Sequence, residues 1–474
     1  MTADNEKTPL TKEFSTTGGD VERRGPTKVY SPWVYVPTLL AAFSVAYLLF
    51  SWGITLFKPA RPTHTPINCD SVNQSSGYIQ LGNSSTKYFH WYFESRSDPE
   101  FDPLVVWLNG GPGASSMIGL LSENGPCNVQ SDLSLKYNPH AWNSHANVIW
   151  LDQPATTGFS VGPAPTPESV GPNVYAFLQG FLAKHPSLRN RSLFLTGESF
   201  AGHYIPAIAH TIITENAKHN TTTRLNLQGI AIGNGLTNTE IQAAHQLDQV
   251  YKNAYNISLV PVNETAALNQ SAAACVHVLH QCQTNKTMCK DATACFVALQ
   301  TNTSAYHPYN PFDMRETCVG GVCSAGELPV AKLLNTPRVL SYLGMPPSFH
   351  FELENPEAFA PFVDNIATSA APFVETVLHA NLPVLLYAGD ADLMCNWQGI
   401  DAWALNLTWD GAKAYANTTL TPLRRNGTEV AHIRSSSLLT FVRIKNAGHM
   451  VPRHQPATML SLLTSFLTNQ SFVF

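Results

Sequence analysis

Charged residues are scarce in this chain. Aspartate, glutamate, lysine and arginine together make up 13% of its 474 residues, and the formal net charge is −5. A balance this close to neutral provides no basic surface for a phosphate backbone, so we do not expect nucleic acid as a partner. Hydrophobic residues account for 44% of the sequence, which is ample for a large buried core.

Charge is absent altogether from Trp33 to Phe57, a run of 25 residues. As a helix this run would be about 37 Å long, enough to cross a bilayer with some tilt. A buried core helix and a cleaved signal peptide are the alternatives. A signal peptide would have a shorter apolar region, followed by a cleavage site with small residues. We therefore expect an uncleaved transmembrane anchor over 33–57. The polar, mixed-charge residues 1–32 are expected to form a disordered tail.

Cysteines and glycosylation sequons are both missing before residue 69. All nine cysteines and all thirteen Asn-x-Ser/Thr sequons follow the expected anchor. This distribution is typical of passage through an oxidising, glycosylating compartment. We expect a cytosolic tail and a lumenal or extracellular body, in the vacuolar or secretory pathway or at the cell surface. The sequon asparagines are Asn73, Asn83, Asn190, Asn220, Asn256, Asn263, Asn269, Asn285, Asn302, Asn406, Asn417, Asn426 and Asn469.

Strand-like apolar runs alternate with helix-compatible segments through most of the body. This alternation predicts an α/β domain with a mainly parallel sheet covered on both faces. We expect this domain over 87–474, after a stem or leading loop over 58–86, with an insertion at about 236–348 above the carboxyl edge of the sheet. The expected strands are Tyr88 to Phe93, Leu104 to Leu108, Asn147 to Leu151, Ser192 to Thr196, Leu227 to Ile232, Val384 to Tyr387 and Leu438 to Ile444.

Six of the nine cysteines cluster in the expected insertion. Zinc binding is one interpretation of the first four cysteines. Their spacings are wider than those of structural zinc sites, and the expected compartment is oxidising, so disulfides are favoured. Pairing Cys69 with Cys127 would leave Cys395 as a free thiol. The pairs expected in the insertion are Cys275–Cys295, Cys282–Cys289 and Cys318–Cys323.

The stretch Gly197-Glu-Ser-Phe-Ala-Gly202 lies between a buried apolar run and a helical pattern. A strand, a turn of small residues and a helix form the setting of a nucleophile elbow, in which the helix N-terminus faces the serine hydroxyl. Small-residue turns of this kind are common, so the stretch needs support from other parts of the chain.

Three further motifs provide this support. Trp107-Leu-Asn-Gly-Gly-Pro-Gly113 follows one strand and frees backbone N–H groups for an oxyanion hole. Gly389-Asp-Ala-Asp392 and Gly448-His449 follow the two late strands, and they place acidic and imidazole side chains at the edge where Ser199 emerges. The order Ser, Asp, His is that of α/β-hydrolases.

From about residue 70 to the C-terminus, the chain resembles the serine carboxypeptidases, an acid-acting family of the α/β-hydrolase fold. The resemblance rests on six motifs in the order of the family: WLNGGPG, DQP…TGFS at Asp152 to Ser160, GESFAGHYIP, AIGNG, GDADLMCNW and GHMVP. It implies a catalytic triad of Ser199, Asp392 and His449, with Asp390 as a structural residue. It also implies an oxyanion hole formed by the N–H groups of Gly111 and Phe200.

The same resemblance implies that Asn109, Glu123 and Glu198, with Trp107 nearby, grip the terminal carboxylate of a substrate. Two glutamates beside a bound carboxylate cannot all be charged in a partly dry pocket, so at least one pKa must rise. The protonated glutamate would then donate a hydrogen bond to the substrate, which predicts an acidic optimum. In the alternative reading, Glu198 is a helix N-terminal charge and Glu123 a surface residue.

We therefore expect a serine-type carboxypeptidase that acts on peptide and protein C-termini without a cofactor or metal. An acyltransferase or esterase on the same scaffold is the first alternative, and a catalytically inactive binding protein is the second. The free thiol of Cys395 resembles one near the pocket in one branch of the family, although a buried inert thiol fits equally well. The sequence does not set the oligomeric state.

Overall fold

The computed structural model describes residue 67, residues 69–218, 224–304 and 309–318, residue 323 and residues 327–472. The expected tail over 1–32 and the expected anchor over 33–57 lie outside these residues. Within the described ranges, no helix is both long enough and apolar enough to cross a membrane.

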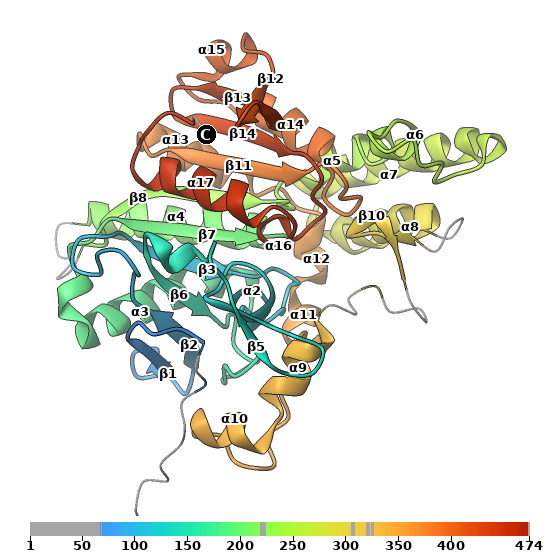
Figure 1. Cartoon of the computed structure of the whole chain (residues 1–474). Coiled ribbons are helices and arrows are strands. Elements are labelled where there is room, and N and C mark those ends of the chain that lie inside the picture. Colours follow the sequence, from blue (N-terminus) through green and yellow to red (C-terminus); the bar gives the residue numbers. More distant parts are fainter. Residues whose placement is uncertain are drawn as a thin grey trace, which may run out of the picture. The chain divides into compact units, whose positions relative to one another are not determined.

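A ten-stranded sheet has the order β1-β2-β6-β3-β7-β8-β11-β14-β13-β12 (Figure 1). The run from β6 to β14 is parallel, and antiparallel strands extend it at both edges. The mainly parallel sheet expected from the sequence is therefore present. The strands are β1 Gln74–Gln80, β2 Lys87–Phe93, β3 Leu104–Leu108, β6 Asn147–Leu151, β7 Leu193–Glu198, β8 Leu227–Gly233, β11 Val384–Gly389, β12 Thr421–Arg425, β13 Thr428–Ser436 and β14 Leu439–Ile444. Two small sheets pair β4 Cys127–Val129 with β5 Leu135–Tyr137, and β9 Tyr309–Asn310 with β10 Asp313–Thr317.

The central strands follow the sequence closely, whereas the edge strands do not. β3 and β6 begin and end at the predicted residues, and every residue in them is buried, as expected for parallel strands covered on both faces. β1, β12 and β13 were not predicted. Because β1 pairs with β2, the expectation of a stem or leading loop over 58–86 is wrong for residues 74–80.

Helices cover both faces of the sheet. One hydrophobic cluster joins the sheet to α3, α4, α13 and α14, and a second joins its other face to α2, α9, α10 and α17. The helices are α2 Met117–Ser122, α3 Val170–Lys184, α4 Ala201–Ala217, α5 Thr239–Ala244, α6 Asp248–Tyr251, α7 Thr265–Thr284, α8 Cys289–Ser304, α9 Leu328–Leu334, α10 Pro337–Tyr342, α11 Pro356–Phe359, α12 Val363–Ile366, α13 Ala371–His379, α14 Trp397–Leu405, α15 Ala412–Ala416, α16 Val451–His454 and α17 Pro456–Leu467. Single 3-10 turns are Trp142–Ser144, Pro167–Ser169, Pro186–Leu188, Val262–Glu264, Lys286–Met288 and Ala360–Phe362.

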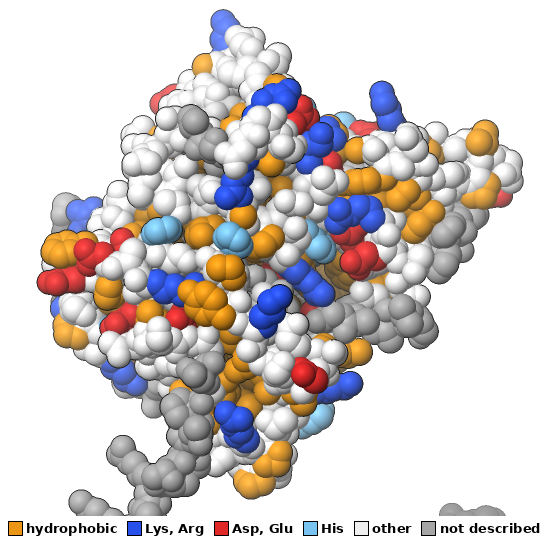
Figure 2. Space-filling model, viewed as in Figure 1, with side chains coloured by type: hydrophobic (Ala, Val, Ile, Leu, Met, Phe, Trp, Pro, Cys, Tyr) orange, Lys and Arg blue, Asp and Glu red, His pale blue; other side chains and the backbone are white. Residues whose placement is uncertain are grey.

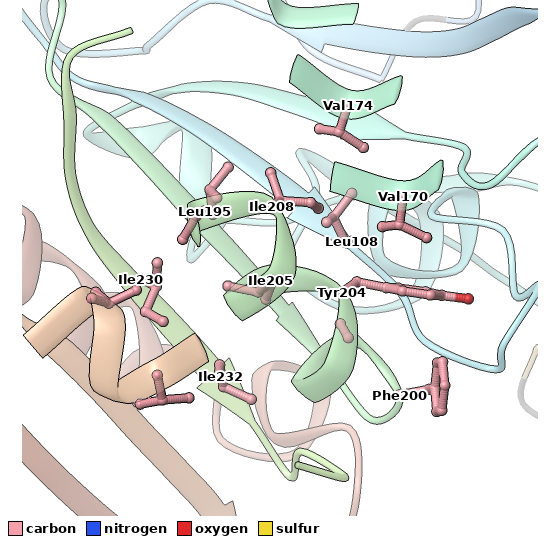
Figure 3. Close-up of a cluster of buried hydrophobic side chains, with 14 of the residues drawn as sticks. Leu108, Val170, Val174, Leu195, Phe200, Tyr204, Ile205, Ile208, Ile230 and Ile232 are labelled. Carbon is pink, nitrogen blue, oxygen red and sulfur yellow. The ribbon is translucent and has the colours of Figure 1, made fainter. Parts of the chain in front are cut away.

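Helix α4, which follows the candidate serine, lies between the sheet and α3 (Figure 3). Its Ile205 and Ile208 are fully buried in one cluster with Leu195 and Ile230 of the sheet and Val174 of α3. Burying one aliphatic side chain of this size stabilises a fold by about 1.5–3 kcal/mol. The start of α4 is therefore anchored from two sides.

The segment between β8 and β11 contains the long hairpin of α7 and α8, which extends away from the sheet in Figure 1. Only four residues of α7 are buried: Leu268, Cys275, Leu279 and Cys282. Two disulfides, Cys275–Cys295 and Cys282–Cys289, join α7 to α8. A disulfide typically adds about 2–4 kcal/mol of stability, which offsets the small core of this hairpin. Because these four cysteines are paired with one another, the zinc alternative is wrong.

Two more disulfides, Cys69–Cys127 and Cys318–Cys323, complete the pairing expected from the sequence, and Cys395 is a buried free thiol. On the face shown in Figure 2, acidic and basic side chains are scattered among hydrophobic ones. Of the thirteen sequon asparagines, Asn220 and Asn302 lie outside the residues whose side chains are described. The other eleven are all exposed, so glycans could be attached to each of them without disturbing the core.

Candidate active site

The turn between β7 and α4 presents Ser199. Its φ angle is 63°, a left-handed conformation that costs a non-glycine residue about 1–3 kcal/mol. Backbone hydrogen bonds hold this conformation: the N–H of Ser199 donates to Gly233, and its carbonyl accepts from Gly202 and Leu236. A strained serine between a strand and a helix is the geometry of a nucleophile elbow.

Glycines next to the elbow allow the chain segments to approach closely. A Cβ atom on Gly197 would lie 2.1 Å from the carbonyl oxygen of Leu108 in β3. A Cβ atom on Gly110, just after β3, would lie 2.3 Å from the backbone nitrogen of Phe200. Only glycine fits at these two contacts, which bring the glycine-rich loop against the serine turn.

The acidic and imidazole side chains expected at this edge form a buried pair. Nδ1 of His449 donates to Oδ2 of Asp392 at 2.7 Å, and both residues are buried. Asp392 also accepts hydrogen bonds from Nδ2 of Asn234 at 2.6 Å and from the N–H of Met394 at 2.9 Å. The backbone N–H of His449 donates to the carbonyl of Phe312 at 2.7 Å, which fixes the loop that carries the imidazole.

The pKa of His449 reflects two opposing effects. Burial lowers it, whereas the charge and the hydrogen bond of Asp392 raise it, so the net pKa lies above the ordinary value for histidine. A raised pKa makes the imidazole a stronger base for a serine hydroxyl.

Ser199 and His449 line one cleft of about 970 Å³. Asn109, Gly111 and Glu198 line the same cleft, so residues from the loop after β3, from β7 and from the loop after β14 converge there. The backbone N–H groups of Gly111 and Phe200 donate no hydrogen bond to any described residue. Two free N–H groups beside the serine are what an oxyanion hole requires.

Next to the serine, Asn109 joins the two glutamates. Oδ1 of Asn109 accepts from Nε1 of Trp107 at 2.8 Å and from the N–H of Gly119 at 3.0 Å. This orients Nδ2 toward the carboxyl groups, and it donates to Glu198 at 3.0 Å and to Glu123 at 3.3 Å. Both glutamates are buried, so the surface alternative for Glu123 is wrong.

The two carboxyl groups share a dry environment. Burial raises the pKa of Glu123, and burial together with the charge of Glu123 raises the pKa of Glu198 well above its ordinary value. Each carboxyl group is also a hydrogen-bond partner of the other, an arrangement that requires one of them to be protonated. The pair can therefore hold a proton, and Glu198, which lines the cleft, can present it to a ligand there.

Asn234 is a residue of the site to which the sequence reasoning gave no role. It follows β8 directly with a φ angle of 39°; its Nδ2 donates to Asp392, and its Oδ1 accepts from the N–H of Gly389 at 3.1 Å. It belongs to the AIGNG motif, and its place just past a strand was the available signal, the same one that identified Asp392 and His449.

Glu327 is a second residue that the sequence reasoning missed. It is 8% exposed and lines the cleft together with Ser199 and His449. Burial raises its pKa to about 7, with a further contribution from the charge of Glu123. Glu327 comes from the insertion and follows no strand, so no local pattern in the sequence marks it.

Asp390 and Cys395 lie near the site, and neither has the surroundings of a catalytic residue. Asp390 accepts hydrogen bonds from the hydroxyl of Tyr255 and from the N–H of Asn446, as a structural residue would. Burial raises the pKa of the Cys395 thiol well above its ordinary value, which favours the inert alternative over a reactive thiolate.

Among the described residues, Asp313, Glu316 and His454 are close enough together to hold a metal ion. Arg315 already donates two hydrogen bonds to the carboxylate of Asp313, and Nδ1 of His454 accepts from the N–H of Gly448 at 3.1 Å. These atoms are engaged in bracing the loop before His449, so we assign no metal to them.

Known proteins of one family match most of this chain. A family model described as serine carboxypeptidase, peptidase S10, matches residues 63–469. The vacuolar serine-type carboxypeptidase ATG42 of Saccharomyces cerevisiae is 35% identical over 424 residues, which cover 86% of this chain and 81% of the relative. Carboxypeptidase Y of Candida albicans is 32% identical over 427 residues, which cover 86% and 76%.

Among solved structures, Kex1Δp, a prohormone-processing carboxypeptidase from Saccharomyces cerevisiae, matches with a TM-score of 0.74 at 24% identity. The match covers 84% of this chain and 92% of that structure, and it shows that the two share the α/β-hydrolase fold. The resemblance carried by the six sequence motifs is thus confirmed over most of the chain. The chain belongs to the serine carboxypeptidase family, peptidase S10.

Proposed function

We propose that Ser199, His449 and Asp392 perform the carboxypeptidase reaction through an acyl-enzyme intermediate. The Ser199 oxygen attacks the last peptide carbonyl while His449 takes the hydroxyl proton, which it then gives to the departing amine. A water molecule, deprotonated by His449, hydrolyses the resulting ester and restores Ser199. Asp392 orients the imidazole, and the N–H groups of Gly111 and Phe200 stabilise the oxyanion.

The observation that carries this proposal is that Asn109 and Glu198 line the same cleft as Ser199, with the buried Glu123 hydrogen-bonded to Asn109 behind them. A protonated carboxyl group at Glu198 can donate a hydrogen bond to the carboxylate of a peptide C-terminus. A neutral ester has no carboxylate to accept this hydrogen bond. The presence of the buried glutamates therefore favours an exopeptidase over the esterase or acyltransferase alternative. It also favours activity at acidic pH, where the shared proton is retained.

The test compares an N-blocked dipeptide with its C-terminal amide, with Ser199→Ala as the inactive control. We expect the free acid to be cleaved far more efficiently than the amide, because only the acid engages the glutamate pair. Equal cleavage of the two, or efficient turnover of simple esters alone, would support the esterase alternative. Failure of a fluorophosphonate to label Ser199 would support the inactive binding protein.

We further propose that residues 33–57 anchor the chain in a membrane, with 1–32 in the cytosol and the catalytic domain in the lumen or outside the cell. The uncharged run, the exposed sequon asparagines and the four disulfides support this topology. One relative is named as vacuolar, and we extend a secretory or vacuolar location to this chain. Protease treatment of sealed vesicles should remove the tail and spare the glycosylated body. Recovery only of chains that begin after Phe57 would refute the uncleaved anchor.

A further inference from the structure

A second histidine holds the backbone directly before His449. The N–H of Gly448 donates to Nδ1 of His454 at 3.1 Å. His454 is the last residue of α16, and its own N–H donates to the carbonyl of Met450 at 3.2 Å, so the short helix folds back onto the loop. The side chain of His454 is 21% exposed, which leaves this contact largely shielded from water.

The start of β10 packs against the same glycine. A Cβ atom on Gly448 would lie 2.4 Å from the carbonyl oxygen of Phe312 and 2.7 Å from Oδ2 of Asp313. The Phe312 carbonyl also accepts from the N–H of His449, and the centres of these two rings are 5.3 Å apart. The position of the imidazole therefore depends on where Gly448 is held, and a misplacement of about 1 Å can cost roughly 100-fold in rate.

The direction of the hydrogen bond fixes the protonation state of His454. A backbone N–H can only donate, so Nδ1 must accept, and the ring must be neutral with its proton on Nε2. Nε2 lies 3.7 Å from Oδ2 of Asp313. In a protonated ring, Nδ1–H would face the N–H of Gly448, donor against donor, and the cation would be attracted to the carboxylate of Asp313. Protonation of His454 therefore removes the contact that holds the loop.

We propose that neutral His454 is a positioning residue, which holds the backbone of Gly448 and thereby places His449 for proton transfer. This inference rests on the proposed function, because it takes His449 to be the catalytic base. It adds a second histidine, outside the triad, whose neutral form the reaction requires. Burial lowers the pKa of His454 below its ordinary value, against the charge of Asp313. The neutral ring is therefore present at pH 7 and is lost as the pH falls through that lowered pKa.

Three substitutions at His454 separate positioning from packing. His454→Asn places an amide oxygen where Nδ1 lies, and this oxygen accepts without titrating. His454→Gln places its oxygen one bond further from the backbone, near the place of Nε2, and His454→Ala has no acceptor. At pH 7, kcat for an N-blocked dipeptide should stay within about twofold in His454→Asn and fall about tenfold in the other two, with KM nearly unchanged. His379→Asn, the same change at an exposed histidine that ends α13, should leave both constants unchanged.

The ratio of kcat in His454→Asn to kcat in the unmutated enzyme gives the pH test. It should be near one at pH 7 and rise to about ten toward pH 4, because only the unmutated enzyme loses its acceptor on protonation. The titratable and charged groups around His454 are Asp313, Arg315 and Glu316 of β10, Arg453 of α16, and Glu327 before α9. These groups and His449 are present in both enzymes, so their titration affects both alike. The rate of fluorophosphonate labelling of Ser199 should give the same ratio, and it involves no substrate carboxylate.

The outcomes separate this inference from the proposed function. A ratio that stays near one down to pH 4, or equal kcat values in His454→Asn and His454→Ala, would overturn the role of His454 alone. A lowered Tm with unchanged kcat in His454→Ala would also overturn it, because His454 would then only stabilise the fold. If His454→Ala and His454→Gln do not fold, the pH ratio of His454→Asn decides. Labelling of Ser199 without C-terminal release by the unmutated enzyme would overturn the proposed function, and the labelling ratio would still test His454.

Discussion

Replacing Glu198 or Glu123 with glutamine tests whether this pair binds the substrate carboxylate with a retained proton. Glutamine keeps the shape and supplies an N–H donor that does not titrate. In the unmutated enzyme the pKa of Glu198 is raised well above its ordinary value. The donor is therefore present below that raised pKa and is lost as the pH climbs through it, so KM should rise with pH.

The size of the effect follows from the bond that is lost. A hydrogen bond to a charged group contributes about 1.5–3 kcal/mol, which corresponds to roughly a 10- to 100-fold change in affinity. Loss of the proton also brings a second negative charge next to the substrate carboxylate, so this range is a lower bound. The kcat profile should behave differently: kcat should fall toward acidic pH, because the reaction needs the neutral form of His449, whose pKa is raised.

The assay measures KM between pH 4 and pH 8 for an N-blocked dipeptide and for its amide. In a Ser199→Ala background, calorimetry gives Kd for the same peptide without turnover. Either glutamine variant should lose most of the pH dependence, and the amide should show little of it even with the unmutated enzyme. The Tm at pH 7 is the folding control. A carboxyl group whose pKa is raised by folding destabilises the folded state at pH values above its unfolded pKa, and glutamine removes this cost. The glutamine variants should therefore have a Tm no lower than that of the unmutated enzyme. A flat KM for the acid substrate, or a full slope in the glutamine variants, would show that these residues are not the carboxylate site.

Three further predictions concern the machinery around the serine. Ser199→Ala and His449→Ala should each lower kcat by several orders of magnitude, and the double variant should cost little more than either alone; additive losses would argue against a single catalytic unit. Asn234→Ala removes a donor from the carboxylate beside His449, so it should lower kcat by about tenfold or more and shift the acidic limb of the kcat profile to higher pH, with KM nearly unchanged. Gly110→Ala places a Cβ atom 2.3 Å from the backbone nitrogen of Phe200, so it should abolish fluorophosphonate labelling and lower the Tm; normal labelling would contradict this close approach.

The parts of the fold that the sequence predicted are those buried on both faces. β3 and β6 are continuous apolar runs because helices cover both sides of the central sheet. The edge strands are different: β12 has one buried residue in five, and no residue of β1 other than Ile79 is buried. Edge strands form because a neighbouring strand offers hydrogen-bond partners, and that neighbour lies elsewhere in the sequence.

The same division applies to the site. Ser199, Asp392 and His449 each follow a central strand, and parallel strands bring their carboxyl ends to one edge of the sheet, so their proximity was predictable from local patterns. Asn234 also follows a central strand, β8, so the same reasoning could have assigned it to the site. Glu327 does not follow a central strand. It lies in the cleft on a segment that is inserted after β8 and contains its own disulfides.

The site residues are positioned by elements that differ in how they pack on the sheet. The central strands position the triad and Glu198, and α2, which packs on the sheet, positions Glu123. Shifting any of these elements would open the buried contacts that hold the sheet together. The hairpin of α7 and α8 has few buried residues in α7 and is held by two disulfides, whereas α9 packs against the sheet through Val330, Leu333 and Leu334. The residues proposed to act on the peptide bond therefore follow strands, and Glu123 of the proposed carboxylate site follows α2. Glu327 reaches the same cleft at the start of α9, so the strand patterns that predict the triad do not predict this residue.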